Sequence, residues 1–213
     1  ETTVQVLKEP GRAAQAKSYM WVQMTQGSGP EGTGPPIRLF GYAPSRSTTA
    51  AVQWYAGLRE GSVLMTDGYE VYDKIAQAHK LVHLGCWAHA RRYMVDALQV
   101  LPKNARTPEQ PAAQFIELIA KLYAVEGNAR ELRMDAQQRQ AHRQEHGVPV
   151  IKAIETLVLT HLHTVVPGSA LGKALHYFSS QWPKLIRYVE DGSYPIDNNA
   201  CENSIRPFVV GRK

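Results

Sequence analysis

The character of this sequence changes at about residue 102, and this change constrains the fold more than any other feature. Before it, runs rich in β-branched and aromatic residues alternate with helical patterns. After it, no strand pattern returns, and apolar residues recur at spacings of three and four, as in Phe115, Leu118, Ile119, Leu122 and Tyr123. The sequence therefore predicts an α/β part followed by a long all-helical part.

The first hundred residues predict a strand meander and then alternating strands and helices. Three strand-like runs come first, with a turn at Pro10-Gly11 and a Gly/Pro-rich loop at 26–36 between them. The first is already under way at residue 1 and ends at Val6 or Leu7, and the others lie at 18–25 and 37–42. A helix from Ser47 or Thr48 to Leu58 follows. Strands are then expected at 62–66, buried on both faces, and at 81–84, each followed by a helix. This order predicts a mixed sheet flanked by helices.

Beyond residue 102 the sequence predicts helices alone. We expect one through 115–123, an exposed charged one over 128–146, one over 150–162 and an apolar seam over 171–189, which Pro183 should kink or split. The chain then divides into three segments. These are an α/β core at 1–101, an all-helical insertion at 102–166, and C-terminal helices at 167–213 that complete the core.

The balance of charge favours a polyanionic partner. Lys and Arg number 24 against 19 Asp and Glu, and the net charge is +5. Two distant cysteines do not make a disulfide framework, which fits a reducing compartment. No apolar run of about 18 residues and no secretion leader occur, so a cytoplasmic location without a membrane is expected. The start at Glu1 and the end at Lys213 suggest a fragment of a longer protein.

The last twenty residues, 194–213, concentrate polar side chains at helical spacing. Asp197 is expected to cap a helix that begins at about Asn198. One face of that helix would carry Asn198, Asn199, Glu202, Asn203 and Arg206, and a separate apolar stripe would carry Cys201, Ile205 and Phe208. Because asparagine is a poor helix former, three within six residues favour a functional site. The alternative is a capped amphipathic helix with a solvated polar face.

These residues also resemble the C-terminal motif of transposases of the insertion-sequence 66 family. The motif here reads Asp197-Asn198-Asn199-x-x-Glu202-Asn203-x-Ile205-Arg206-Pro207-x-x-x-Gly211-Arg212-Lys213, eleven identities over seventeen positions. Two earlier blocks are similar to the same family, Thr66-Asp67-Gly68-Tyr69 and Cys86-Trp87-Ala88-His89-Ala90-Arg91-Arg92. The resemblance covers about 1–100 and 169–213, most of the chain.

The resemblance implies a bacterial transposase domain with a ribonuclease-H-like fold and an Asp-Asp-Glu catalytic triad. Asp67 would be the second triad member and Glu202 the third, both binding Mg²⁺ or Mn²⁺. The first aspartate would fall one residue before Glu1, and Glu1 itself does not replace it. Two such metal ions lie about 3.5–4 Å apart, so we expect Asp67 and Glu202 to come together. Without the first aspartate, the chain as given is expected to be inactive in DNA cleavage.

DNA is the expected partner, as transposon ends and as target. The residues expected to contact it are Asn198, Asn199, Asn203, Arg206, Arg91, Arg92, Arg212 and Lys213. Further copies of the protein on DNA and accessory proteins of the same mobile element are also implied, with a location at the bacterial nucleoid. Four more arginines, at 130, 133, 139 and 143, alternate with acidic residues and predict a solvated helix.

Several alternatives stay open at this point. The chain could be a non-catalytic basic domain for DNA binding or assembly derived from a transposase, or a ribonuclease-H-like nuclease. Asp67 before a glycine is also typical of a turn, and Arg91 and Arg92 are also typical of a solvated helix face. Cys86 and His89, with His83 or His79, suggest zinc, but no distant Cys/His pair completes a recognised spacing.

Overall fold

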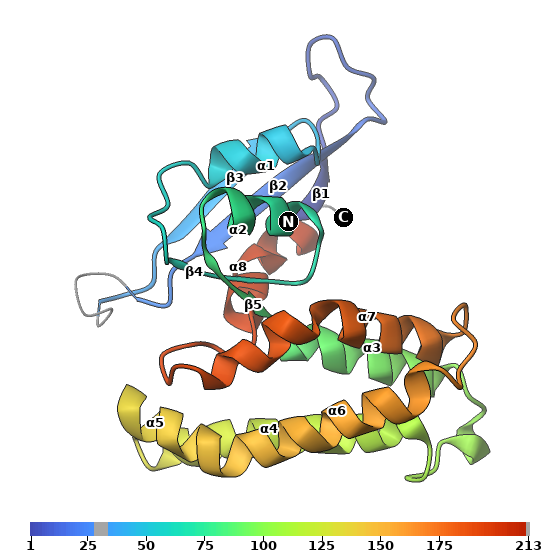
Figure 1. The fold of residues 1–213 in the computed structure, drawn as a ribbon. Helices are drawn as coiled ribbons and strands as arrows, with labels where there is room; N and C mark the ends of the chain where they lie inside the picture. The colour runs from blue at the N-terminus through green and yellow to red at the C-terminus, as the bar shows by residue number, and fades with distance from the viewer. Residues whose placement is uncertain (28–33, 212–213) are drawn as a thin grey trace. The chain divides into compact units, whose positions relative to one another are not determined.

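The computed structural model describes residues 1–27 and 34–211, and its elements form two compact units (Figure 1). The sheet unit comprises Glu1–Ser62, Tyr69–Leu81 and Asn198–Lys213, and the helical unit comprises Val63–Gly68 and Val82–Asp197. Each unit is thus assembled from segments that are distant in the sequence. None of the described helices has the length and apolarity needed to cross a membrane.

The sheet unit is built on the predicted meander. Its strands β1 (Thr2–Gln5), β2 (Lys17–Met24) and β3 (Arg38–Ala43) form an antiparallel sheet in the order β1-β2-β3. Three helices belong to the same unit, α1 (Thr48–Trp54), α2 (Val71–Ala78) and α8 (Asn199–Val210). The predicted strands lie within one or two residues of the observed ones, but α1 ends four residues before Leu58.

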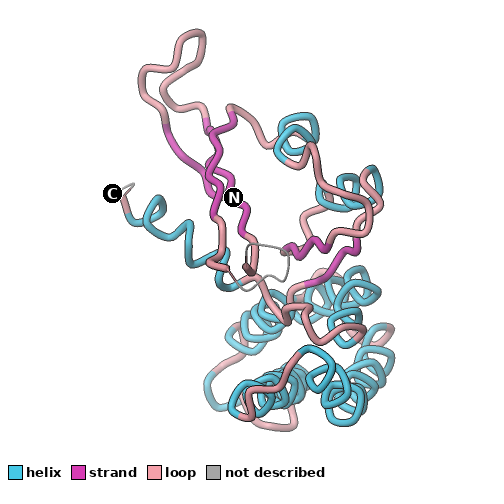
Figure 2. The backbone as a smooth tube through the Cα atoms, turned by 90° about the vertical axis from the view of Figure 1, so that its left-hand side faces the viewer, coloured by secondary structure: helices cyan, strands magenta, loops and turns pink. Residues whose placement is uncertain are grey.

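Alternation along the strands assigns the two faces of this sheet. Trp21 of β2 pairs with Gly41 of β3, and a side chain at Gly41 would overlap the ring of Trp54 in α1. The next pair lies on the opposite face, where Phe40 packs against Phe208 of α8 with ring centroids 5.1 Å apart. Helix α8 therefore covers one face, and α1 lies on the other (Figure 2).

The helical unit holds a short parallel sheet and two layers of helices. Strands β4 (Val63–Thr66) and β5 (Val82–Gly85) pair in parallel. Helices α4 (Pro111–Glu131) and α6 (Val148–Leu162) lie side by side, and α3 (Trp87–Gln99) and α7 (Ala170–Leu185) form the layer against them (Figure 1). The shorter elements are η1 (Lys103–Ala105), α5 (Ala136–His142), the π-helix η2 (Arg143–Gly147) and the 3-10 helix η3 (Ile186–Val189).

Large apolar side chains fill the space between these helical layers. The fully buried residues of this hydrophobic core include Trp87, Phe115, Ile119, Leu122, Ile154 and Phe178. The Trp87 indole N–H donates to the Leu185 carbonyl oxygen (2.9 Å), so even the polar atom of this large core ring is satisfied. The described residues after Gly85 contain no strand, as the sequence predicts.

The structure is mixed α/β, but it differs from the predicted arrangement of strands. The described residues form two separate sheets instead of one mixed sheet. The strand at 63–66 is not buried on both faces either, because Val63 is 45% exposed and only Thr66 is buried. A four-residue apolar run specifies neither its burial nor its neighbours, which explains both errors.

Two predictions about the helices after residue 102 are also corrected. Pro183 does not split the apolar seam, because helix α7 continues through it and gives way to η3 only at Ile186, while a kink at Pro183 stays a prediction. Pro183 and Ser179 are exposed, so water can bond the carbonyl group that proline leaves without a donor. The segment 128–146 is not one exposed helix, because it spans the end of α4, α5 and part of η2, and Arg143 is 1% exposed.

Candidate catalytic and DNA-binding site

Asp67 lies directly after β4, at the carboxyl end of the parallel strand pair, and is partly buried. Its carbonyl oxygen accepts a hydrogen bond from the Tyr177 hydroxyl of α7 (3.0 Å). Gly68 follows with a positive φ of 92°, and a Cβ there would come within 3.0 Å of Gln181 and 3.1 Å of Tyr177. Only glycine fits this position without strain. Gly68 therefore lets Gln181 and Tyr177 approach closely next to Asp67.

Tyr177 connects Asp67 to the first turns of α3. Burial raises the pKa of the Tyr177 hydroxyl well above its usual value, and electrostatic interactions with Cys86, Asp67 and Tyr93 act in the same direction. The positive charge of Arg92 opposes them. The Tyr177 ring also stacks on Tyr93, with centroids 4.5 Å apart and planes at 27°. The Tyr177 hydroxyl group therefore lies within electrostatic range of Asp67 and Arg92.

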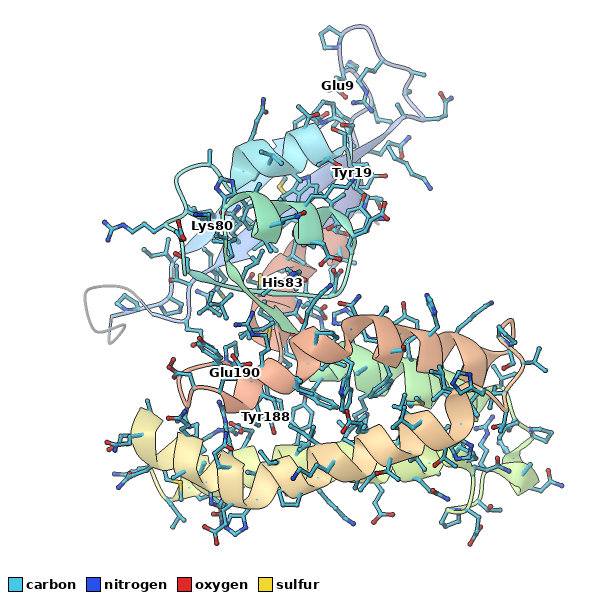
Figure 3. All side chains as sticks on the ribbon, viewed as in Figure 1. Glu9, Tyr19, Lys80, His83, Tyr188 and Glu190 are labelled. Atoms are coloured by element: carbon cyan, nitrogen blue, oxygen red, sulfur yellow. The ribbon has the colours of Figure 1, made fainter. Side chains whose placement is uncertain are left out.

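The residues of the zinc alternative lie in the same unit. Cys86 is the buried N-cap residue of α3, and a hydrogen bond of 2.8 Å joins His83 Nε2 to Thr66 Oγ1 across the two parallel strands. Figure 3 labels His83 at β5. Within residues 1–27 and 34–211, no group of three or more His, Cys, Asp or Glu side chains is placed to hold a metal ion. The zinc alternative therefore lacks a ligand set there.

Asp197 does not occupy the capping position that the sequence predicts. The N-cap of α8 is Asn198, one residue later, and it makes no side-chain capping hydrogen bond. The Asp197 carboxylate instead accepts a hydrogen bond from the Tyr123 hydroxyl of α4 (2.7 Å). Burial is the main cause of a strongly raised pKa of Tyr123, Asp197 adds to it, and Arg91 opposes it. Within the helical unit, Tyr123 therefore holds Asp197 through this hydrogen bond, and Arg91 lies within electrostatic range of Tyr123.

Arg143 holds the segment that leads to Asp197. Its guanidinium group makes a bidentate ion pair with Glu126 of α4 (2.7 and 2.8 Å). It also donates to the carbonyl oxygens of Tyr188 (2.7 Å), Asp191 (2.7 Å) and Tyr194 (2.9 Å). All five of its N–H groups are thereby used. Figure 3 shows Tyr188 between the helical layers. This buried network fixes the path of residues 188–194.

Glu202 lies in the first turn of α8, in the sheet unit, and is partly buried. Burial raises the pKa of the neighbouring Cys201 thiol, Glu202 acts in the same direction, and Arg38 of β3 acts against it, while α8 also packs against β1. Glu202 therefore shares its surroundings with β1 and with β3. The predicted apolar stripe is confirmed at Ile205, which is buried, while Phe208 is only partly covered.

The other predicted site residues divide between the two units. Arg91 and Arg92 are exposed on α3 in the helical unit, with Asp67. Asn198 is partly buried, and three further residues are exposed on α8 of the sheet unit with Glu202, namely Asn199, Asn203 and Arg206. Arg212 and Lys213 lie outside the described residues. The prediction that Asp67 and Glu202 come together stays a prediction.

Sequence reasoning missed the tyrosines of the helical unit, Tyr93, Tyr123 and Tyr177, together with Gln181. A weak signal was present for two of them. Tyr177 and Gln181 are four residues apart and follow the flank of the apolar seam that begins at Leu171. Polar residues on the edge of a buried helix face are candidates for contacts with a neighbouring site, whereas Tyr93 and Tyr123 carry no such signal.

Comparison with known proteins identifies the protein family to which the chain belongs. The chain matches the family described as "Transposase IS66 family" over residues 1–213. It therefore belongs to the IS66 transposase family, as the sequence motifs suggested. No solved structure matches the chain.

Three relatives come from Sinorhizobium fredii (strain NBRC 101917 / NGR234). The uncharacterized protein y4jD is 30% identical over 212 residues, which cover 96% of this chain and 39% of that protein. The uncharacterized protein y4qI is 28% identical over 220 residues, and the match covers 100% of this chain and 39% of that protein. The uncharacterized protein y4hP is 26% identical over 193 residues, which cover 85% of this chain and 34% of that protein. The chain thus spans well under half the length of these relatives.

Proposed function

We propose that this chain forms part of the catalytic domain of a DNA transposase, with Asp67 and Glu202 as catalytic and metal-binding carboxylates. The observation that carries the proposal is the position of Asp67. It ends a parallel strand, it is anchored through Tyr177, and it lies in one unit with the exposed Arg91 and Arg92. In α/β proteins, carboxyl ends of parallel strands are common sites for ligands. The family match over the whole chain points to DNA as that ligand.

The proposed reaction displaces one oxygen at phosphorus by another. A water or a DNA 3′-hydroxyl oxygen forms a bond to phosphorus while the bond from phosphorus to the leaving DNA oxygen breaks. The incoming oxygen loses a proton to solvent, and the leaving oxygen takes one up. Asp67 and Glu202 would orient the reacting groups, and the exposed arginines would hold the flanking phosphates.

The donor chemistry of the proposed carboxylates suits Mg²⁺ or Mn²⁺. These hard cations prefer oxygen ligands, and Mg²⁺ commonly keeps several waters, so few protein ligands are needed. A bound divalent cation would supply charge stabilisation at the developing oxyanion. Asp67 and Glu202 would contribute oxygen ligands, and a third carboxylate encoded before Glu1 would complete the triad. Helix α8, which carries Glu202, packs against β1, so the position of β1 is consistent with this proposal.

The finer structural assignments belong to the same proposal. We place the ribonuclease-H-like core in 1–101 and 167–213, with 102–166 as a helical insertion. The two alternatives, a non-catalytic DNA-binding or assembly domain and a ribonuclease-H-like nuclease, make different predictions. The first binds DNA without cleaving it, and the second cleaves without joining strands. Assays of cleavage and strand transfer on one substrate separate all three.

DNA binding by the chain is expected to weaken as salt rises. Each phosphate contact by Arg or Lys releases counterions and contributes about −0.9 to the slope of log K against log salt. Arg91→Gln and Arg92→Gln should each reduce the steepness of that slope by about one. Fluorescence anisotropy of a labelled blunt duplex at several salt concentrations measures both quantities.

Lys152→Gln provides the matched control, because Lys152 is an exposed cation on α6 of the same unit. Its slope should equal that of the unmodified chain. Binding that does not depend on salt, or equal slopes for all four proteins, would contradict the role of Arg91 and Arg92. The absence of binding even at low salt would contradict the proposed function itself.

A further inference from the structure

An exposed aromatic ring lies on α3, in the residue that directly follows the two arginines in the sequence. Tyr93 is 41% exposed, although tyrosine rings are usually mostly covered. One face of its ring is covered by the stacked ring of Tyr177, which is only 8% exposed. The exposed part of Tyr93 therefore belongs to its other face and its edge.

This ring is held rigidly with respect to Asp67. Tyr177 is fixed at both ends, by packing in the core and by the hydrogen bond from its hydroxyl to the Asp67 carbonyl oxygen (3.0 Å). Tyr93 stacks on that fixed ring and is carried by a well-packed helix whose Trp87, Ala90 and Met94 are buried. A planar group on the outer face of Tyr93 would extend the stack by one layer.

The charges beside the ring indicate what kind of planar group fits. Arg91 and Arg92 precede Tyr93 directly and are exposed, and Arg92 lies within electrostatic range of Tyr177, on which Tyr93 stacks. The chain as a whole carries a net charge of +5. Cations that follow a phosphate backbone, combined with an aromatic ring on which a base can stack, characterise surfaces that bind unpaired nucleotides. A base inside a duplex offers no free face, so such a ring distinguishes unpaired from paired DNA.

We propose that Tyr93 is a stacking platform for an unpaired DNA base, with Arg91 and Arg92 on the adjoining phosphates. The platform would hold an unpaired nucleotide next to Asp67. This inference rests on the proposed transposase function and makes it more specific, because it states that this surface binds unpaired DNA. A transposase must handle free strand ends, which provide such nucleotides.

The test compares two labelled probes, a blunt duplex and the same duplex with a short single-stranded overhang. The full chain should bind the overhang probe more tightly. Tyr93→Leu, which keeps apolar volume but removes the ring, should weaken overhang binding by about 5- to 150-fold, the range expected for one base–aromatic stack. Its binding of the blunt duplex should stay within about twofold of the unmodified chain, since duplex bases cannot stack on the ring.

Three further variants make the result specific. Tyr93→Phe and Tyr93→Trp keep a stacking face and should retain preference for the overhang, while Val100→Ala, at an exposed position beyond the end of α3, should change nothing. These variants also show whether Tyr93→Leu fails only because it disturbs folding, which thermal melting checks directly.

The possible outcomes separate this inference from the proposed function. Equal losses on both probes in a folded Tyr93→Leu protein, or no loss on either, would overturn the platform. So would a change of oligomeric state without a change in overhang binding, which would place the ring in a protein interface. Tyr93-dependent overhang binding by a natural-length protein that does not cleave DNA would support the platform and overturn the catalytic proposal.

Discussion

Glu202→Gln is expected to reduce DNA cleavage at least about a hundredfold in the protein at its natural length, assayed with Mg²⁺. The change keeps the size of the side chain but removes a negative charge and a good oxygen ligand for the cation. Metal ions supply several kcal/mol of transition-state stabilisation, and each loss of about 1.36 kcal/mol slows the reaction tenfold. Initial rates of strand cleavage on a labelled transposon-end duplex measure the effect.

Folding and DNA binding should survive this substitution. Glu202 lies in the first turn of α8, where a carboxylate stabilises a helix by only about 0.3–1 kcal/mol. The buried contact of α8 through Ile205 is not altered. DNA binding should stay the same or tighten slightly, since a charge that repels phosphate has been removed. A loss of cleavage without a loss of binding is therefore the expected combination.

Glu190→Gln is the matched control for charge and size. Glu190 is exposed and pairs only at the surface with Arg187 (3.2 Å), an interaction of the kind worth about 0–1 kcal/mol. The Glu190→Gln variant should cleave DNA at the same rate as the unmodified protein. Cleavage by Glu202→Gln at close to the unmodified rate would show that the catalytic assignment is wrong. The asparagine-rich face of α8 would then be a binding surface only.

Local patterns predicted the elements of this protein better than their assembly. The meander at 2–43 and the two strand–helix pairs after it follow from short runs rich in β-branched, aromatic and other apolar residues and from turn residues. The Asp67-Gly68 pair, typical of a turn, follows β4 directly, and Gly68 has a positive φ of 92°. Such features depend on a few neighbouring residues, which the sequence shows directly.

The contacts that define the candidate site are long-range and could not be predicted in this way. Asp67 and Tyr177 are 110 positions apart, and Asp197 and Tyr123 are 74 apart. An aspartate before a helix is typical of a cap, but the same carboxylate can equally accept a hydrogen bond from a distant side chain. The sequence around Asp197 does not distinguish these two uses. The periodicity of a single segment carries no information about which tyrosine on another helix will meet it.

The burial of Arg143 illustrates the same limit for charge. Its segment alternates basic and acidic residues, which is typical of a solvated helix. Its partner Glu126 lies 17 positions earlier, on another element. A fully bonded guanidinium group can be buried where an unpaired one cannot, and this depends on backbone carbonyl groups that sequence patterns do not reveal.

Arg143→Met should lower the free energy of unfolding of the chain by about 3–5 kcal/mol, the usual cost of breaking a buried ion pair by removing one partner. Glu126 would be left as a buried charge, and the carbonyl oxygens of Tyr188, Asp191 and Tyr194 would each lose a donor. Urea unfolding followed by far-ultraviolet circular dichroism measures the change. Arg130→Met, at an exposed position near the end of α4, should stay within about 0.5 kcal/mol.

The double variant Arg143→Met, Glu126→Leu separates the two contributions of Arg143. Removing both charges abolishes the penalty of an unpaired buried carboxylate, and such replacements are often neutral on their own. The three carbonyl groups stay without their donor, and each buried unsatisfied group costs about 1–3 kcal/mol. We therefore expect the double variant to recover only part of the loss. If the double variant recovered the full free energy of unfolding, Arg143 would matter only as the partner of Glu126. If Arg143→Met alone lowered the free energy of unfolding by less than about 1 kcal/mol, Arg143 would not anchor residues 188–194.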